Sequence, residues 1–103
     1  MKIYGTQSSR AVRPIWTVEE MGLEYELDMM PFPPRVFQKE YLETNILGTV
    51  PYLVDGDVKM TESVAMCQYI VEKYGPTDLC VQPDEKDYPN YLNWLFHSDA
   101  TLT

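Results

Sequence analysis

Residues 49–63, TVPYLVDGDVKMTES, constrain the fold of this chain most, because they combine a strand entry, a tight hairpin and a helix start. Asp55-Gly56 lies between two alternating apolar segments, and glycine accepts the positive φ that a two-residue hairpin turn requires. Pro51 has no N–H to give to a sheet ladder, so we expect it at the first residue or the edge of a strand. The segment therefore predicts two antiparallel strands followed by a helix.

The same segment carries the groups of a binding site. A cis Val50-Pro51 bond would leave the backbone N–H and C=O of Val50 pointing outward, where they can hold an extended peptide by strand-like hydrogen bonds. Ser63 opens a helix whose free N–H groups favour a carboxylate, and Glu62 can accept from an ammonium. The simpler alternative is that Glu62 and Ser63 only cap the helix and complement its dipole. Beside the proline-bounded edge, we interpret them as a site for a small zwitterionic peptide.

Composition excludes several classes of function. The net charge of -8 and the eight scattered Lys and Arg residues argue against nucleic acid, which needs a basic stripe. No apolar run approaches the ~18 residues of a membrane span, and nothing resembles a signal peptide, so we expect a soluble cytoplasmic protein. Cys67 and Cys80 are too few and too irregularly spaced for a disulfide scaffold or a zinc knuckle, and we expect no metal site.

The whole chain follows the pattern βαβ and then ββα. We expect a strand over residues 1–5, a helix over 9–21, a strand around 25–27, a shorter helix from Arg35 or Val36 to about Thr44, the hairpin, and a helix over 63–74. The expected inward residues are Val12, Ile15, Trp16 and Val18 in the first helix, Phe37, Tyr41 and Leu42 in the second, and Val64, Cys67, Ile70, Val71 and Tyr74 in the third. This order predicts an α/β domain over residues 1–76.

Beyond the domain, residues 77–87 have the composition of an acidic linker. A further helix is predicted from residue 88, and its apolar residues cover more than one stripe: Tyr88, Tyr91, Leu92, Trp94, Leu95 and Phe96. A helix of this kind is surrounded by partners. We therefore interpret residues 88–103 as the first helix of an all-α domain that is truncated in this sequence.

These residues together resemble the cytosolic glutathione S-transferase family, and the resemblance covers essentially the whole chain. It is carried by Tyr4-Gly5, by Ser8-Ser9 before Arg10 and Arg13, by residues 19–26 (EEMGLEYE), by Asn45 and Gly48 ahead of residues 50–56 (VPYLVDG), and by residues 61–63 (TES) leading to Tyr69-Ile70. The resemblance implies a thioredoxin-like domain with a mixed four-stranded sheet. It also implies glutathione as co-substrate, an electrophilic small molecule as second substrate, and a homodimer.

In that family the ligand would lie along the predicted edge. Val50-Pro51 would pair with the cysteinyl backbone of glutathione, Ser63 would hold the γ-glutamyl carboxylate, and Glu62 would assist at the glutamyl end. Arg35 or Lys39 would meet the glycyl carboxylate. Lowering the thiol pKa from about 8.5 by two units needs ~2.7 kcal/mol, which a donated hydroxyl hydrogen bond and a helix N-terminus can supply together.

The activating hydroxyl of serine-type members lies four residues before an arginine, and Ser9 with Arg13 reproduces this offset. Ser8 is the alternative, and Tyr4 resembles the tyrosine-type position only loosely, because we expect it to pack inward. Both serines could instead be plain N-caps of the first helix. No cysteine lies at residues 7–10, so dithiol exchange at this place is excluded.

The resemblance thus implies a transferase that conjugates glutathione to an electrophile. Glutathione-dependent reduction, dehalogenation or isomerisation, or a binding module without catalysis, are the alternatives. The 103-residue chain on its own is expected to be inactive, because the second domain would form most of the electrophile pocket. Cys67 is expected to be a core residue, and no role is assigned to Cys80 or His97.

Overall fold

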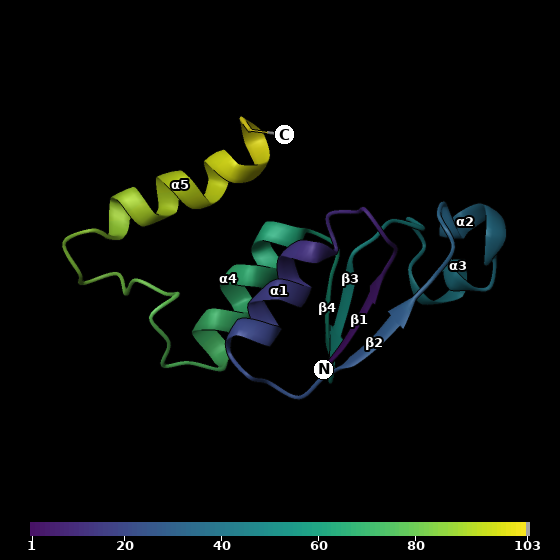
Figure 1. Cartoon of the computed structure of the whole chain (residues 1–103), viewed down its shortest axis with the longest axis horizontal. Helices are drawn as coiled ribbons and strands as arrows, with labels where there is room; N and C mark the ends of the chain where they lie inside the picture. Colours follow the sequence, from purple (N-terminus) through teal and green to yellow (C-terminus); the bar gives the residue numbers. More distant parts are fainter. Residues whose placement is uncertain (103) are drawn as a thin grey trace.

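The computed structural model describes residues 1–102, and Figure 1 shows a sheet flanked by helices. Its elements are β1 (Lys2–Gly5), α1 (Val12–Glu20), β2 (Glu26–Met29), α2 (Pro34–Phe37), α3 (Tyr41–Thr44), β3 (Tyr52–Asp55), β4 (Val58–Met60), α4 (Ser63–Lys73) and α5 (Tyr88–Ala100). This order confirms the predicted βαβ unit, the hairpin and the two later helices.

The sheet is mixed, with strand order β2-β1-β3-β4. β1 runs parallel to β2 and antiparallel to β3, which pairs antiparallel with β4. Asp55 pairs with Val58, so the hairpin turn is Gly56-Asp57 and not the predicted Asp55-Gly56. Gly56 still supplies the positive φ, at 60°. The turn moved by one residue because the ladder between β3 and β4 extends through Asp55.

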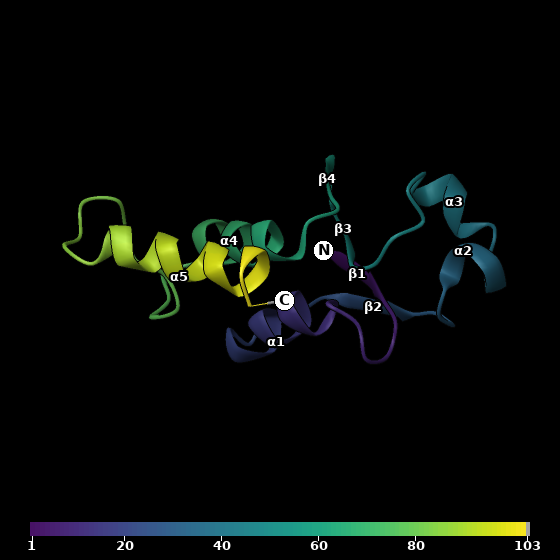
Figure 2. The same cartoon turned by 90° about the horizontal axis from the view of Figure 1, so that it is seen from above.

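The alternation of side chains divides the sheet into two faces. Ile3 opposes Leu53 in the ladder, and both are fully buried in a cluster with Val18, Met66 and Ile70. α1 and α4 lie side by side over this face (Figures 1 and 2). The main core therefore lies between the central strands and these two helices.

The predicted inward face of α1 is partly wrong. Val12 and Trp16 are 57% and 65% exposed, while Pro14 and Val18 are buried together with Ala11. The reason is a close approach of the helix start to β1. A Cβ added at Gly5 would lie 2.8 Å from the Cβ of Ala11, so Ala11 fills the space against β1 and the neighbouring Val12 turns outward.

The other face of the sheet carries a cluster of tyrosines. Tyr4 and Tyr52 oppose each other in the ladder and pack with buried Tyr41 and Met30. The Tyr4 ring lies 5.5 Å from that of Tyr41 and 6.1 Å from that of Tyr52, centroid to centroid. Tyr4 thus packs in the predicted inward manner.

The single helix predicted from residue 35 to residue 44 is wrong, because the chain forms the two short helices α2 and α3. Gln38 separates them with a non-helical φ of -140° and ψ of 70°. Of the three residues expected inward, only Tyr41 is buried, and Phe37 and Leu42 are exposed. Each short helix buries a single residue, Pro34 in α2 and Tyr41 in α3, so its other apolar residues stay exposed.

α4 starts at Ser63 as predicted and is fixed to the sheet through Asp55. The Asp55 carboxylate accepts hydrogen bonds from the Tyr69 hydroxyl at 2.6 Å, the Tyr74 hydroxyl at 2.7 Å and the Lys73 ammonium at 3.1 Å. These donors hold the pKa of Asp55 at about 2, with the two tyrosines contributing most. The cluster joins the end of β3 to the last turn of α4.

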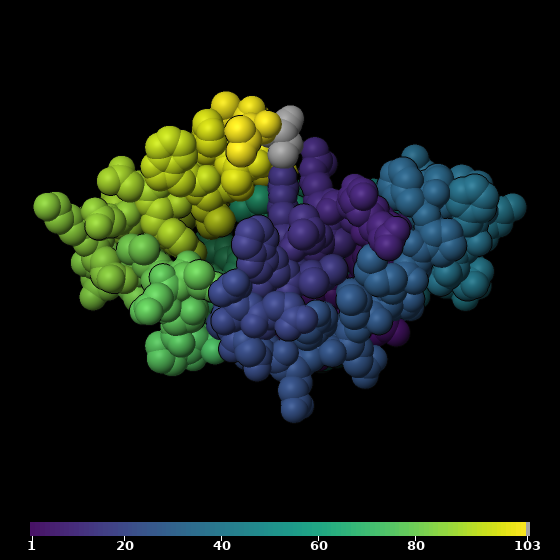
Figure 3. All heavy atoms as spheres, viewed as in Figure 1, coloured from purple at the N-terminus to yellow at the C-terminus, as the bar shows by residue number. Residues whose placement is uncertain are grey.

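α5 begins at Tyr88 as predicted and packs against α4 without burying any of its own residues. Of its predicted apolar residues, Trp94 and Phe96 are exposed and Leu95 is half-buried. Figure 3 shows the segment before α5 and α5 itself at one end of the molecule, with α2 and α3 at the other. Within residues 1–102, no helix is long and apolar enough to cross a membrane.

Candidate functional site

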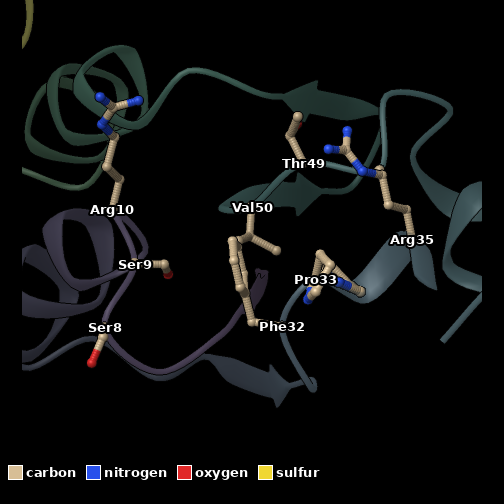
Figure 4. A pocket seen from close by; sticks show the side chains of 10 residues that line it. Ser8, Ser9, Arg10, Phe32, Pro33, Arg35, Thr49 and Val50 are labelled. Atoms are coloured by element: carbon tan, nitrogen blue, oxygen red, sulfur yellow. The ribbon is translucent and has the colours of Figure 1, made fainter. Parts of the chain in front are cut away.

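A cavity of about 390 Å³ opens between the loop after β1, the start of α2 and the segment before β3 (Figure 4). Its lining residues are Ser8, Ser9, Arg10, Phe32, Pro33, Pro34, Arg35, Gly48, Thr49 and Val50. It therefore gathers Ser9, its predicted alternative Ser8, Arg35 and Val50, which the sequence predicts for one site, from segments far apart in the chain.

Ser9 and Ser8 differ in orientation. The Ser9 hydroxyl is half-buried and points toward the cavity in Figure 4, whereas the exposed Ser8 side chain points away from it. Ser9 Oγ donates to the carbonyl of Thr6 at 2.8 Å and accepts from the N–H of Ala11 at 3.2 Å. The N-cap position of α1 is Ala11, and no side chain caps it, so the interpretation of the two serines as plain N-caps is wrong. Ser9 holds the turn that leads into α1 and also faces the cavity.

The Val50-Pro51 peptide bond is cis, as predicted. The sheet ladder of β3 begins at Tyr52, so it does not use the backbone N–H and C=O of Val50, while Pro51 is buried. The preceding residue is held by two side chains. The Tyr41 hydroxyl and Asn45 Nδ2 donate to the Thr49 carbonyl at 2.7 Å and 3.0 Å.

Arg35 lies on the cavity wall opposite Ser9, and Figure 4 shows its guanidinium directed toward Thr49. Gly48 makes this position possible. Its φ is 66°, and a Cβ added there would lie 2.9 Å from the Cβ of Arg35. Lys39, the other predicted partner of a glycyl carboxylate, is exposed and does not line the cavity. The structure therefore separates the two candidates.

Ser63 and Glu62 lie outside the cavity lining, at the start of α4. The buried Ser63 hydroxyl accepts from Arg13 Nη1 at 3.0 Å, and the same nitrogen donates to Asp99 Oδ1 at 2.7 Å. Glu62 is exposed and accepts from the Thr61 hydroxyl at 3.0 Å. Arg13 therefore joins the start of α4 to the first turn of α1. Ser9 lies in the loop just before that turn.

The charge of the cavity was missed by the sequence prediction. Arg10 and Arg35 both line it, while the lining contains no carboxylate, although the chain has a net charge of -8. The spacing of Arg10 relative to Ser9 was visible in the sequence, but its place in the cavity was not. The Thr6 hydroxyl, buried and without a partner among residues 1–102, was also not foreseen.

The remaining reactive side chains lie elsewhere. Cys67 is half-buried and accepts from the Thr17 hydroxyl at 3.3 Å, and burial raises the pKa of its thiol. Cys80 is half-buried beside Gln82, and His97 packs edge-on against Trp94 with the ring centroids 5.1 Å apart. Among the residues that the structure describes, no three His, Cys, Asp or Glu side chains gather into a candidate metal site.

Comparisons with known proteins agree with this architecture. Residues 1–72 match the family model of the glutathione S-transferase N-terminal domain. A probable glutathione S-transferase of Oryza sativa subsp. japonica is 36% identical over 97 residues, which cover 92% of this chain and 45% of the relative. A glutathione S-transferase structure from Actinobacillus pleuropneumoniae superimposes with a TM-score of 0.79 at 27% identity, over 94% of this chain and 46% of that one.

A glutathione transferase homologue from Drosophila mojavensis, solved with bound glutathione, superimposes with a TM-score of 0.70 at 30% identity, over 81% of this chain and 39% of that one. This chain thus spans about half the length, or less, of the relatives that it matches.

The sheet order and the flanking helices define a thioredoxin-like domain. With the match over residues 1–72, the family follows directly. The chain belongs to the cytosolic glutathione S-transferase family.

Proposed function

We propose that this chain binds glutathione in the cavity beside Val50 and promotes ionisation of its thiol at Ser9, as part of a transferase that conjugates the thiolate to an electrophilic small molecule. The observation that carries the proposal is the single cavity in which Ser9, Val50 and Arg35 meet. The structures and names of relatives support the same ligand, since one of them holds glutathione.

The arrangement suits the three parts of the tripeptide. The free backbone groups of Val50 pair with the extended cysteinyl unit. Ser63, next to the Arg13 guanidinium, receives the γ-glutamyl carboxylate, and Glu62 accepts from its ammonium. Arg35, on the far wall, meets the glycyl carboxylate. A guanidinium at each end matches the two carboxylates of the ligand.

Ser9 acts on the sulfur in this proposal. Its hydroxyl, which now donates to the Thr6 carbonyl, turns to donate to the thiolate when the ligand is bound. A hydrogen bond to a charged acceptor contributes about 1.5–3 kcal/mol, which is enough to lower a thiol pKa by one to two units. The proton leaves to solvent, the sulfur attacks the electrophile, and the leaving group departs.

The wider setting is proposed from the same family. Relatives are about twice as long, so we infer that α5 opens a helical domain that lines the electrophile pocket, after a linker over residues 77–87. Exposed apolar side chains on and after α2 and α3, including Phe37, Ile46 and Leu47, support a homodimer contact. We place the protein in the cytoplasm, as an enzyme without a metal.

One observation favours a second candidate, a glutathione-binding module without catalysis. The Ser9 proton is engaged by the Thr6 carbonyl, and a serine that keeps this bond would hold the turn before α1 without acting on the sulfur. The reductase, dehalogenase and isomerase alternatives would use the same thiolate with a different second substrate.

Two measurements on the full-length protein separate these candidates. Titration calorimetry with reduced glutathione tests binding, and the ultraviolet thiolate band of the bound ligand, followed against pH, tests ionisation. The transferase proposal expects binding and a thiolate band that persists below pH 7. Binding without such a band supports the module, and no heat with glutathione contradicts both.

A further inference from the structure

Arg10 is the one cation of the cavity that the proposed function leaves without a task. Arg13 and Arg35 already serve the two ends of glutathione, and Arg10 adds a third positive charge. Its side chain is exposed, and within residues 1–102 it forms no hydrogen bond or ion pair. A guanidinium left free beside a ligand cavity is available to an anionic group of the ligand.

The position of Arg10 points to the second substrate and not to glutathione. Arg10 follows Ser9 directly in the chain, and Figure 4 shows it on the wall that carries Ser9, with Val50 between it and Arg35. An electrophile must bring its reacting carbon to within about 3–3.5 Å of the sulfur that Ser9 contacts. A group on the far side of that electrophile therefore comes within reach of the Arg10 side chain.

Phe32 adds a preference for an aromatic ring. Its side chain is 67% exposed and lines the same cavity, where Figure 4 shows the ring beside Val50 and across from Ser9. Pro33 extends the apolar surface next to it. Figure 4 shows the Arg10 side chain extending along the wall that carries Ser9 and away from Phe32. A ring that stacks on Phe32 therefore meets this guanidinium through a substituent that projects along that wall.

Resting on the proposed function, we propose that Arg10 is a specificity-determining residue that binds a carboxylate of the electrophile, so that the preferred second substrates are aromatic electrophiles bearing a carboxylate. Arginine pairs with carboxylates in a fixed two-pronged geometry, which fixes the ring orientation as well as its charge. The reaction itself stays a substitution in which the C–S bond forms and the leaving group departs as an anion.

The test compares two electrophiles that differ in one charge, 4-chloro-3,5-dinitrobenzoate and N-methyl-4-chloro-3,5-dinitrobenzamide. In both, glutathione sulfur replaces chloride. The measured quantity is the ratio of the two kcat/KM values on the full-length protein, divided by the same ratio for the uncatalysed reactions. This correction removes the intrinsic difference in reactivity between the two compounds.

We expect the corrected ratio to favour the benzoate by about tenfold, the lower end of what a charge-assisted hydrogen bond contributes. Arg10→Gln should abolish this preference with the amide rate unchanged, and Arg10→Lys should keep part of it. Arg35→Gln is the matched control: it should raise the KM for glutathione with both electrophiles and leave the ratio as it is. Added salt should reduce the preference, because Arg10 is exposed.

A corrected ratio that is the same in the parent protein and in Arg10→Gln overturns the inference while the proposed function stands. So does an Arg10→Gln variant whose only change is weaker glutathione binding, because Arg10 would then serve the tripeptide. If calorimetry finds no glutathione binding and neither electrophile is turned over, the proposed function is wrong, and the inference that rests on it is wrong as well.

Discussion

Arg13 Nη1 donates to Ser63 Oγ at 3.0 Å, so a residue of the first turn of α1 fixes the hydroxyl that opens α4. The same nitrogen reaches Asp99 on α5 at 2.7 Å, which connects residues 86 positions apart in the chain. The Arg13 side chain is 20% exposed and that of Asp99 is 41% exposed, so solvent screens this ion pair from the Asp99 side.

We therefore expect Arg13→Gln to weaken glutathione binding about fivefold, because Ser63 loses the charged donor that orients it. The free energy of unfolding should also fall by about 1–3 kcal/mol. Calorimetry and denaturant unfolding measure the two effects. Asp99→Asn is the control, since it keeps Arg13 beside Ser63. An equal loss of glutathione affinity in both variants would show that Ser63 is not the group through which Arg13 acts.

Ser9→Ala should lower turnover in the full-length protein by about 10- to 100-fold and change glutathione affinity little, because the hydroxyl acts on the thiolate and not on the carboxylates. Steady-state kinetics with a chloronitrobenzene measures this effect. Loss of the hydrogen bond that Ser9 Oγ accepts from the Ala11 N–H should cost an additional ~1 kcal/mol of stability.

Ser8→Gly is the matched variant for Ser9. Ser8 has a φ of 56°, so glycine removes its hydroxyl at a position where the backbone suits glycine. Turnover should remain near the parent level. If turnover falls further in Ser8→Gly than in Ser9→Ala, Ser8 and not Ser9 is the residue that acts on the thiol.

Asp55 should make stability depend on pH in the acid range. Its pKa is about 2 in the folded protein against 3.8 without partners, so its contribution is complete above pH 4 and disappears as the pH falls from about 4 to 2. About 1–2 kcal/mol should be lost over this window, after allowance for screening by solvent. Asp55→Asn should flatten this part of the profile, measured by unfolding in urea at several pH values. Asp57→Asn, at the exposed turn next to it, should leave the profile unchanged.

Gly48→Ala should destabilise the chain more than Gly22→Ala. Both glycines have a positive φ, 66° and 65°, so alanine carries the same backbone cost of about 1–2 kcal/mol at each. Only at Gly48 would the new methyl group lie 2.9 Å from Arg35, whereas nothing lies within 4 Å at Gly22.

Glutathione affinity gives the second readout of this pair. Gly48→Ala should weaken binding, because Arg35 is displaced from the cavity wall, and Gly22→Ala should not. Equal affinities in the two variants would argue that Arg35 does not touch the ligand. Thermal unfolding of both variants supplies the stability comparison.

The parts of the fold that the sequence predicted well are those that local chemistry determines. α4 begins at Ser63 and ends at Lys73, shortly before the helix breaker Pro76. The predicted glycine cap is wrong, because the C-cap residue is Tyr74 and Gly75 has no positive φ. In the hairpin, Val58-Lys59-Met60 alternates between apolar and polar residues, whereas Tyr52-Leu53-Val54 is a continuous apolar run. Gly56 marks the turn between the two strands. The cis Val50-Pro51 bond before β3 was predicted for a similar local reason.

The failures concern residues whose environment depends on distant parts of the chain. Trp16 and Phe37 are apolar at helical spacing, yet both face outward, because the small residues at the start of α1 face the sheet and α2 is a single turn. Hydrophobicity alone does not say which side of such a helix meets the sheet. The contact from Arg13 to Asp99 and the meeting of Arg10 with Arg35 in one cavity depend on tertiary packing, which residue spacing does not encode.

The close contact between Gly5 and Ala11 sets how high the entrance of α1 stands above the end of β1. Because Ser9 lies just before this contact, the size of residues 5 and 11 governs how deep the Ser9 hydroxyl lies in the cavity. A larger side chain at either position would push the start of α1 away from β1 and move Ser9 with it. In related chains, these two positions should accordingly vary together and stay small wherever the serine performs chemistry.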